Sequence, residues 1–389
     1  MPRDLTSPSF AAPARHHIGL LSTFPPKLCG LATYAAALQR ELRRAGHRVD
    51  SMVIDDGDTI VGAHATATLV NGMPSTAATV SAALRLCDVA IIQHEYGIYG
   101  GRDGDELIEL MATLDVPTVV ILHTVPLVPT PHQKFVLETV AGMANRAVVM
   151  TEAARTRLLA SYAVDPLTVS TIPHGASAPS HGVHAHPAAA DARPMLLTWG
   201  LLGPGKGIEH AIDALAMLDR ADRPRYTVAG VTHPKVMARD GDAYRRSLIE
   251  RARVAGVAAD VVFDDTYRDV PELMRFVASA TAVVLPYDSR DQVTSGVLVD
   301  AIAAGRPVIA TAFPHAVELL GTGAGIIVPH ADVAAMADAM RAVVVDRDRR
   351  RAMEREAHRL APALSWTRVA DTYGSLVARL ARSLAPVAP

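Results

Sequence analysis

The sequence has few cysteines, no long apolar run and no excess of positive charge, and each shortage excludes a class of protein. The two cysteines, Cys29 and Cys87, are too few for a disulfide framework or a four-thiolate zinc site. The chain contains no apolar run of about 18 residues, the length that a membrane-spanning helix needs. Lys and Arg number 38 against 40 Asp and Glu, whereas nucleic-acid-binding proteins usually carry a basic excess. These shortages favour a cytoplasmic protein that binds no nucleic acid and touches membranes at most peripherally.

Several short motifs are also absent. Residues 1–15 lack the apolar segment of a secretory signal peptide and are expected to form a loose tail. No GxGxxG follows the first expected strand, which argues against a dinucleotide-dependent dehydrogenase. The glycine-rich loop at residues 203–207 lacks the GxxxxGK[ST] spacing of a P-loop.

The length and the apolar content of the chain predict two domains. With 389 residues, 50% of them hydrophobic, the chain is too long for one ordinary core. Both halves alternate short apolar runs with segments of helical periodicity, a pattern typical of parallel α/β sheets. We expect a first domain over residues 16–180, a linker over 181–194 and a second domain over 195–364. A final helix over 365–385 is expected to cross back to the first domain.

The segment from Leu285 to Leu320 contains the clearest local signals. Ser295 is a good N-cap for a helix that Gly305 ends, and Pro307 prevents its continuation. A short buried strand and another helix follow. The N-terminus of the first helix has free backbone N–H groups and the positive end of a helix dipole, which suit a phosphate.

The expected strand ends place the binding site between the domains. Ligands of open parallel sheets bind at the carboxyl ends of the strands. In this sequence those ends carry the segments PPKLCG, HEYG, His123, GPGKG, AGVTHP and DQVTSG, which come from both halves. The sequence therefore predicts a cleft that both domains line.

Several segments resemble family 4 glycosyltransferases. GLLGPGKGIEHAIDAL, VAGVTHP and LPY…TSGVLVDAIAAGRPVIATAFPHAVELL resemble the donor half of that family, and TFPPKLCGLATYAAAL and QHEYGIYGG resemble the acceptor half of one branch. The resemblance covers nearly all of residues 16–380. It implies the α/β GT-B fold, in which two Rossmann-like parallel-sheet domains face each other across a cleft. It also implies retaining transfer of a hexose from a nucleotide sugar to a carbohydrate or glycolipid acceptor, with no metal and no other cofactor.

The resemblance assigns the donor contacts to a pair of carboxylate positions and a lysine. Family members have two glutamates separated by seven residues, and Gln292 and Asp300 occupy these positions here. The first position holds sugar hydroxyls and the second holds the ribose. Lys206 matches the lysine that contacts the diphosphate, where it would stabilise the charge of the leaving group.

The sequence departs from the family pattern at these positions. Gln292 carries no charge, and Leu201 or Leu202 stands where an arginine is expected. Arg290 and Asp291 are the candidates to supply the missing charges. The full set of expected donor-binding residues is Gly30, Gly205, Lys206, Arg290, Asp291, Gln292, Thr294, Ser295, Gly296, Val297 and Asp300.

Catalytic residues and acceptor contacts follow from the same resemblance. His123, Lys206 and Gln292 are the expected catalytic residues; His123 would touch the donor sugar near the reacting carbon. The acceptor side is expected to include His94, Glu95 and Tyr96. Glu318, at another helix start, lies where the family often has a glutamate near the donor.

Each of these assignments has a structural alternative. A lone histidine at a strand end is often a structural residue, Ser295 can serve only as a cap, and Lys206 can be a solvated loop lysine. Cys29 is not expected to be a nucleophile, because no Cys-His-Asn order is evident.

The sequence leaves the donor and the reaction class open. GDP-mannose is the first expectation for the donor and UDP-glucose the second. The alternatives to a transferase are a sugar-nucleotide epimerase or phosphorylase on the same fold, and a non-catalytic nucleotide-sugar-binding protein.

Overall fold

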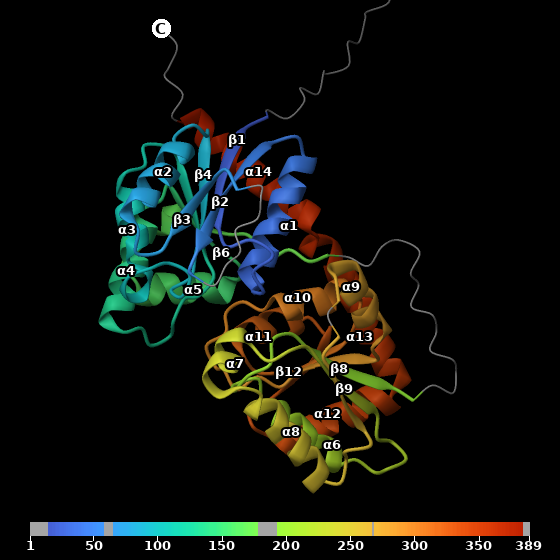
Figure 1. The fold of residues 1–389 in the computed structure, drawn as a ribbon. Coiled ribbons are helices and arrows are strands. Elements are labelled where there is room, and N and C mark those ends of the chain that lie inside the picture. The colour runs from blue at the N-terminus through green and yellow to red at the C-terminus, as the bar shows by residue number, and fades with distance from the viewer. Residues whose placement is uncertain (1–14, 58–64, 178–192, 267, 384–389) are drawn as a thin grey trace, which may run out of the picture.

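The computed structural model describes residues 15–57, 65–177, 193–266 and 268–383. Within these residues the chain forms two parallel-sheet domains with helices on both faces of each sheet (Figure 1). The expected tail at 1–15 and linker at 181–194 lie almost wholly outside the described residues. None of the described helices combines the length and the apolar character that a membrane crossing needs.

The first domain is built on a sheet of seven described strands in the order β3-β2-β1-β4-β5-β6-β7. Neighbouring strands are parallel, so their carboxyl ends share one edge. The strands are β1 (His17–Ser22), β2 (Arg48–Asp55), β3 (Ala67–Val70), β4 (Val89–His94), β5 (Thr118–Leu122), β6 (Arg146–Val149) and β7 (Val169–Thr171). The helices are α1 (Gly30–Arg44), α2 (Pro74–Leu84), α3 (Glu106–Ala112), α4 (Pro131–Met143) and α5 (Glu152–Ser161).

The second domain repeats this plan with six described strands in the order β10-β9-β8-β11-β12-β13. The strands are β8 (Met195–Trp199), β9 (Arg225–Ala229), β10 (Val261–Asp264), β11 (Ala282–Leu285), β12 (Val308–Thr311) and β13 (Gly325–Val328). Its helices are α6 (Ile208–Ala216), α7 (Pro234–Asp240), α8 (Ala243–Val254), α9 (Val270–Ser279), α10 (Gly296–Ala303), α11 (Pro314–Leu320), α12 (Val333–Val345) and α13 (Arg347–Leu360), and the chain ends in α14 (Trp366–Ser383). The expected fold class, two Rossmann-like parallel sheets, is confirmed.

Elements β3, α2, α7 and β13 had no clear sequence signal. The two strands, β3 and β13, are only partly buried, and α2 has an Ala- and Thr-rich sequence without an apolar stripe. Helix α2 is fixed by tertiary packing, because its Val80 and Leu84 are fully buried against the first sheet.

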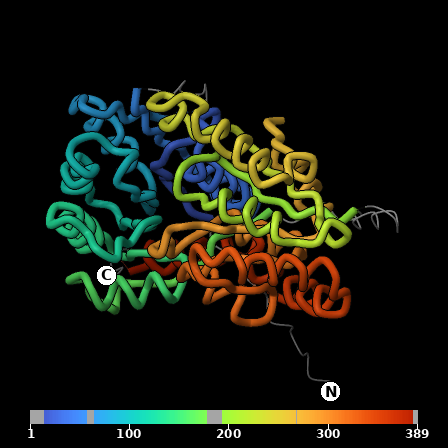
Figure 2. Tube along the Cα trace, turned by 90° about the horizontal axis from the view of Figure 1, so that it is seen from below, coloured from blue at the N-terminus to red at the C-terminus, as the bar shows by residue number. Residues whose placement is uncertain are grey.

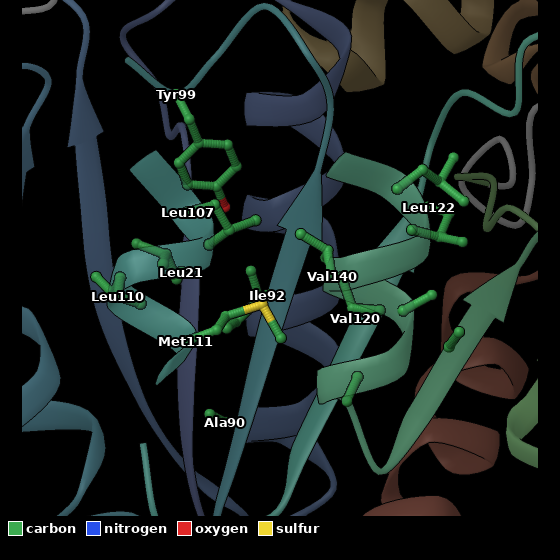
Figure 3. Close-up of a cluster of buried hydrophobic side chains, with 14 of the residues drawn as sticks. Leu21, Ala90, Ile92, Tyr99, Leu107, Leu110, Met111, Val120, Leu122 and Val140 are labelled. Atoms are coloured by element: carbon green, nitrogen blue, oxygen red, sulfur yellow. The ribbon is translucent and has the colours of Figure 1, made fainter. Parts of the chain in front are cut away.

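The first sheet is packed on both faces. Figure 3 shows one of the two cores, in which Leu21, Ile92 and Val120 of neighbouring strands meet Met111 of α3 and Val140 of α4. On the other face the strands pack against α1 and against α14, the last helix of the chain. The sheet is therefore rigid, and its carboxyl-end loops are held in fixed positions.

Helix α14 returns from the second domain to the first. In Figure 1 helix α14 lies beside α1 and the first sheet, and Figure 2 shows the two domains from below, with the first in blue to green and the second from yellow-green to red. Trp366 lies edge-on to the Tyr34 ring at 4.8 Å, and the hydroxyls of Tyr34 and Tyr373 are hydrogen-bonded at 3.0 Å. A Cβ on Gly175 would lie 2.3 Å from the Trp366 ring, so this close packing requires glycine there.

Candidate active site

A cavity of about 310 Å³ lies where the carboxyl ends of the two sheets meet. His123, directly after β5, and Thr124 line it from the first domain. The loop between β11 and α10 lines it from the second domain, through Ser289, Asp291, Gln292, Val293 and Thr294. The fold thus brings together His123 and Gln292, which are far apart in the sequence.

The N-terminus of α10 borders this loop. Ser295 caps the helix, since its hydroxyl accepts a hydrogen bond from the Leu298 N–H at 3.3 Å. Contrary to expectation, the Ser295 N–H is engaged within the protein, because it donates to Nδ1 of the buried His315 at 2.9 Å. Helix geometry leaves the N–H groups of Gly296 and Val297 without an intrahelical partner. These two, rather than all three, are the candidate phosphate donors.

Lys206 lies beside this helix terminus, in the loop after β8. Its ammonium is 4.6 Å from the centroid of the Tyr287 ring, and the Tyr287 hydroxyl is hydrogen-bonded to the Ser295 side chain. Burial lowers the pKa of Lys206 from its usual value. The lysine and the α10 terminus are therefore linked through a single aromatic side chain, which brings two sources of positive potential together.

The Lys206 loop is fixed by glycines. Gly207 has a φ of +62°, and a Cβ there would lie 1.8 Å from the carbonyl oxygen of Pro286. Gly205 has a φ of +89° and no atom within 4 Å of a Cβ position. The loop therefore packs tightly on the end of β11 at Gly207 and remains open beside Gly205, where a ligand can approach. The buried Leu202 anchors the start of the loop.

The two positions of the carboxylate motif differ in their surroundings. The Gln292 side chain lines the cavity and donates through Nε2 to the Thr294 carbonyl at 3.1 Å. Burial raises the pKa of Asp300 to about 7, although a hydrogen bond from the Ser177 backbone lowers this pKa in part. Asp300 is thus a half-buried carboxyl that titrates near neutral pH.

His174 belongs to the site, and the sequence analysis missed it. It precedes the expected linker, and its Nδ1 donates to the Gly175 carbonyl at 2.7 Å. A Cβ on Gly296 would lie 3.0 Å from the His174 ring, so the imidazole lies directly against the first residue of α10. The only sequence signal was a His-Gly pair after a strand, which is too common to be specific.

None of the three expected acceptor-side residues lines the cavity, and Glu95 and Tyr96 are partly exposed. His94 is fully buried, and neither of its ring nitrogens has a hydrogen-bond partner. The carboxylate of Glu95 accepts hydrogen bonds from the Thr124 hydroxyl at 2.5 Å and from the Tyr96 N–H at 3.1 Å. Tyr96 donates its hydroxyl to the Gln133 carbonyl at 3.2 Å. Thr124, supported by Glu95, is the member of this group that lines the cavity.

Two expected donor residues lie elsewhere. Arg290 is exposed and lines a different cavity of about 510 Å³, together with Ala312 and residues 327–330. Gly30 is the exposed first residue of α1, and no atom lies within 4 Å of a Cβ position there. Neither residue lines the cavity that His123 and Gln292 share.

Helix α5 holds the second domain against the first. Its N-cap Thr151 donates its hydroxyl to the Val293 carbonyl at 2.9 Å, and Arg157 donates to the Asp291 carbonyl at 2.8 Å. The Val293 side chain is packed in the core of the first domain. Glu318 accepts from the N–H groups of Glu152 and Ala153 at 3.0 and 2.8 Å. Glu318 therefore caps a helix of the other domain instead of lining the cavity.

Replacing Glu318 with alanine is expected to weaken domain closure by about 1 kcal/mol, because two N–H groups at a helix start lose their acceptor. We expect a larger radius of gyration by small-angle X-ray scattering. Glu152→Gln, at the same helix terminus, is the matched control and should leave the scattering unchanged. Identical curves for Glu318→Ala and the wild type would show that this contact does not hold the domains together.

The site can be compared with known proteins. Residues 193–346 match the family model described as glycosyl transferases group 1. A D-inositol 3-phosphate glycosyltransferase of Kineococcus radiotolerans is 29% identical over 293 residues, which are 66% of this chain and 65% of the relative. The match thus spans slightly less than two thirds of that relative's length.

Solved structures show the same fold. A sucrose-phosphate synthase from Thermosynechococcus elongatus superposes with a TM-score of 0.77 at 20% identity, covering 95% of this chain and all of the other. HepE of Anabaena, in complex with UDP-glucose, gives a TM-score of 0.70 at 18% identity, covering 95% of this chain and 100% of that chain. The match to the group 1 model thus lies within the second domain, and the two domains together have the GT-B fold.

Proposed function

We propose that the protein is a retaining glycosyltransferase that moves a hexose from a nucleoside-diphosphate hexose to a carbohydrate or glycolipid acceptor. The observation that carries the proposal is the arrangement of Lys206 and the α10 N-terminus around Tyr287, next to the cavity that His123 and Gln292 share. This arrangement offers a diphosphate site and a sugar site side by side. The group 1 match over the second domain supports the same conclusion.

In this proposal the second domain binds the donor. The N–H groups of Gly296 and Val297 bind the diphosphate, and Lys206 neutralises the charge that develops on it as the glycosidic bond breaks. Asp300 binds the ribose. Because the lysine and the helix dipole supply positive potential, we propose that no metal ion or other cofactor is needed.

Bond exchange then takes place at the domain interface. Gln292 and His123 hold the hexose on opposite sides of the 310 Å³ cavity. Burial lowers the pKa of His123 to about 3, with His174 and His94 acting in the same direction, so the ring is neutral and hydrogen-bonds without charge. The acceptor attacks on the face that the diphosphate leaves, and the leaving phosphate takes the acceptor proton. Closure of the domains by α5 keeps out water that would hydrolyse the donor.

The donor is tested by calorimetry with GDP, UDP and ADP and their hexose conjugates. GDP-mannose is our first candidate and UDP-glucose the second. Solved structures of Anabaena HepE contain UDP or UDP-glucose, which is a reason to test UDP-glucose early. We expect one nucleotide to bind clearly, and its hexose conjugate to support transfer to sugar or sugar-phosphate acceptors, with and without a chelator. Failure of every nucleotide to bind would overturn the proposal.

Asp300→Asn should show a pH-dependent defect in donor binding. The carboxyl has a pKa of about 7, so it is largely protonated at pH 6, where asparagine is a fair mimic, and ionised at pH 8, where it is not. We expect calorimetry to show that the ratio of wild-type to variant donor affinity rises between pH 6 and pH 8, by up to about tenfold. A ratio that does not change with pH would exclude Asp300 from the ribose site.

A non-catalytic nucleotide-sugar-binding protein is the second candidate. One observation favours it: the Gln292 amide is neutral and its Nε2 is already bonded to the Thr294 carbonyl. Donor binding without transfer or hydrolysis would support this alternative. Gln292→Glu, which restores the charge of the family pattern, would then be the variant to assay for gain of transfer.

A further inference from the structure

Three side chains with metal-binding atoms meet at the edge of the first sheet opposite to the cavity. His17 begins β1, Asp50 lies near the start of β2, and Cys87 precedes β4. These strands are neighbours in the order β2-β1-β4. The cavity lies at the carboxyl ends of the same sheet, beyond His94 and His123, so this group takes no part in the proposed transfer.

The distances within the group suit a small metal ion. Nε2 of His17 is 2.8 Å from Oδ2 of Asp50 and 3.6 Å from Sγ of Cys87, and the three atoms lie within 4.8 Å of one another. Bond lengths of about 2.0 Å to nitrogen and 2.3 Å to sulfur in a tetrahedral zinc site separate the two ligand atoms by about 3.5 Å. Modest side-chain rotations would therefore complete three corners of a tetrahedron.

The surrounding packing holds these side chains in place. A Cβ on Gly19 would lie 2.6 Å from the Leu84 side chain and 3.1 Å from the Cys87 sulfur, so glycine allows Cys87 to approach β1. Arg48 donates to Oδ2 of Asp50 at 3.1 Å and orients the carboxylate. Cys87 is 6% exposed, whereas His17 and Asp50 are each 19% exposed at the side chain, which leaves access for a water molecule.

An ordinary structural role explains only part of the arrangement. An ion pair between His17 and Asp50 would not need the sulfur atom beside the imidazole. Cys29, the other cysteine, has a local role, because its sulfur accepts a hydrogen bond from the Ala32 N–H at the start of α1. Cys87 instead makes its side-chain contacts with the Ala83 carbonyl and the His17 ring.

We propose that His17, Asp50 and Cys87 bind one thiophilic divalent cation, zinc by its chemistry, with water as the fourth ligand. A thiolate and a carboxylate balance the charge of the ion, and the mixed N, O and S set suits zinc better than magnesium or calcium. Because a thiol must lose its proton to bind the ion, affinity should increase with pH. The ion would tie three neighbouring strands together, which is a structural role for the first domain.

Cobalt titration of the purified, chelator-treated protein tests the proposal. We expect visible bands of tetrahedral cobalt and a near-ultraviolet band from thiolate-to-cobalt charge transfer, both removed by one equivalent of zinc. Cys29→Ser is the matched control and should keep both bands. Cys87→Ser should lose the thiolate band, and Cys87→Ser and Asp50→Asn should weaken zinc binding by about 100-fold or more.

Stability provides a second readout that does not depend on activity. Zinc at 100 times its Kd should raise the melting temperature by about 5 °C or more in the wild type and in Cys29→Ser, and should not do so in Cys87→Ser. Circular dichroism verifies that each variant is folded. No cobalt bands in the wild type, or an unchanged thiolate band in folded Cys87→Ser, would overturn the proposal. Sugar transfer is expected to be unaffected by zinc, so the two proposals fail independently.

Discussion

Lys206→Ala should bind the donor nucleotide about 10 to 150 times more weakly than the wild type, a loss of about 1.5–3 kcal/mol for a charged hydrogen bond. The ammonium lies 4.6 Å from the Tyr287 ring centroid and is partly removed from water, so solvent screens its charge less than that of a surface lysine. The turnover number should fall further than the affinity does, because the diphosphate gains charge as the glycosidic bond breaks. Calorimetry and a nucleotide-release assay measure the two effects.

Two further variants separate charge from packing. Lys206→Met keeps the apolar stem over Tyr287 and removes only the charge, so it should match Lys206→Ala in its loss of affinity. Lys134→Ala removes an exposed lysine whose ammonium bonds the Ser161 carbonyl in the first domain, and it should bind donor normally. If Lys206→Met binds the nucleotide as tightly as the wild type, the phosphate site lies elsewhere.

Acid should destabilise the protein between pH 7 and pH 5, because four buried histidines together oppose folding by roughly 4–8 kcal/mol over this range. Asp300 acts in the opposite direction: with a pKa of about 7 it takes up a proton in the folded state while the unfolded carboxyl stays ionised, which offsets about 2 kcal/mol of the loss. Burial lowers the pKa values of His94 and His174 to about 4 and those of His123 and His315 to about 3. An unfolded histidine titrates near 6.5, so at pH 5 each costs about 2 kcal/mol when it must stay neutral in the folded state. The lower end of this range of roughly 4–8 kcal/mol lies below the sum of four such contributions, because His123 and His174 are only half-buried and solvent reduces their share.

The direction of this effect follows from proton binding. At pH 7 the four histidines are neutral in the folded state and mostly neutral in the unfolded state. Below about pH 6.5 the unfolded chain binds protons that the folded protein does not, so stability falls as the pH falls, until the folded-state pKa values near 3–4 are reached. Urea unfolding at pH 7, 6 and 5 measures the slope, and scattering shows whether the domains separate first.

His94→Leu isolates one of these histidines. Neither ring nitrogen of His94 has a partner, so the substitution breaks no hydrogen bond of the side chain. The variant should be at least as stable as the wild type at pH 7 and about 2 kcal/mol less sensitive to acid at pH 5. The exposed His358 provides the control, since His358→Gln should keep the wild-type slope. If the free energy of unfolding of His94→Leu depends on pH as steeply as that of the wild type, His94 does not contribute to acid sensitivity.

Much of the architecture could be predicted from the sequence because its signals are local. Apolar runs alternating with helical periodicity gave two parallel α/β domains, and a cap and a glycine stop located α10 to within one residue at its start and two at its end. Strand-end positions predicted that His123 and Gln292 lie in one cavity, which the structure confirms, whereas the role of Lys206 in the glycine-rich loop stays a prediction. Each of these signals depends on residues a few positions apart.

Such local signals did not predict some short elements, or which side chains pair across the fold. Strand β13, three of whose four residues are only partly buried, was not predicted. Ser295 was expected to offer its N–H to phosphate, but His315 takes it. Glu318 was expected near the donor, yet it caps α5, 166 residues away. A sequence shows which atoms can accept a hydrogen bond, but not which donor the fold brings to them.

The sequence by itself determined the class of fold, the domain count and the position of helix α10, because hydrophobic periodicity, glycine conformation and helix capping act within a few residues. The tertiary structure decided which of these groups meet. It placed His174 against Gly296, packed Val293 into the core of the other domain and brought Cys87 to the His17 ring, 70 residues away. These contacts depend on how whole sheets and helices pack, and that packing is set by the summed burial of both domains rather than by any local pattern.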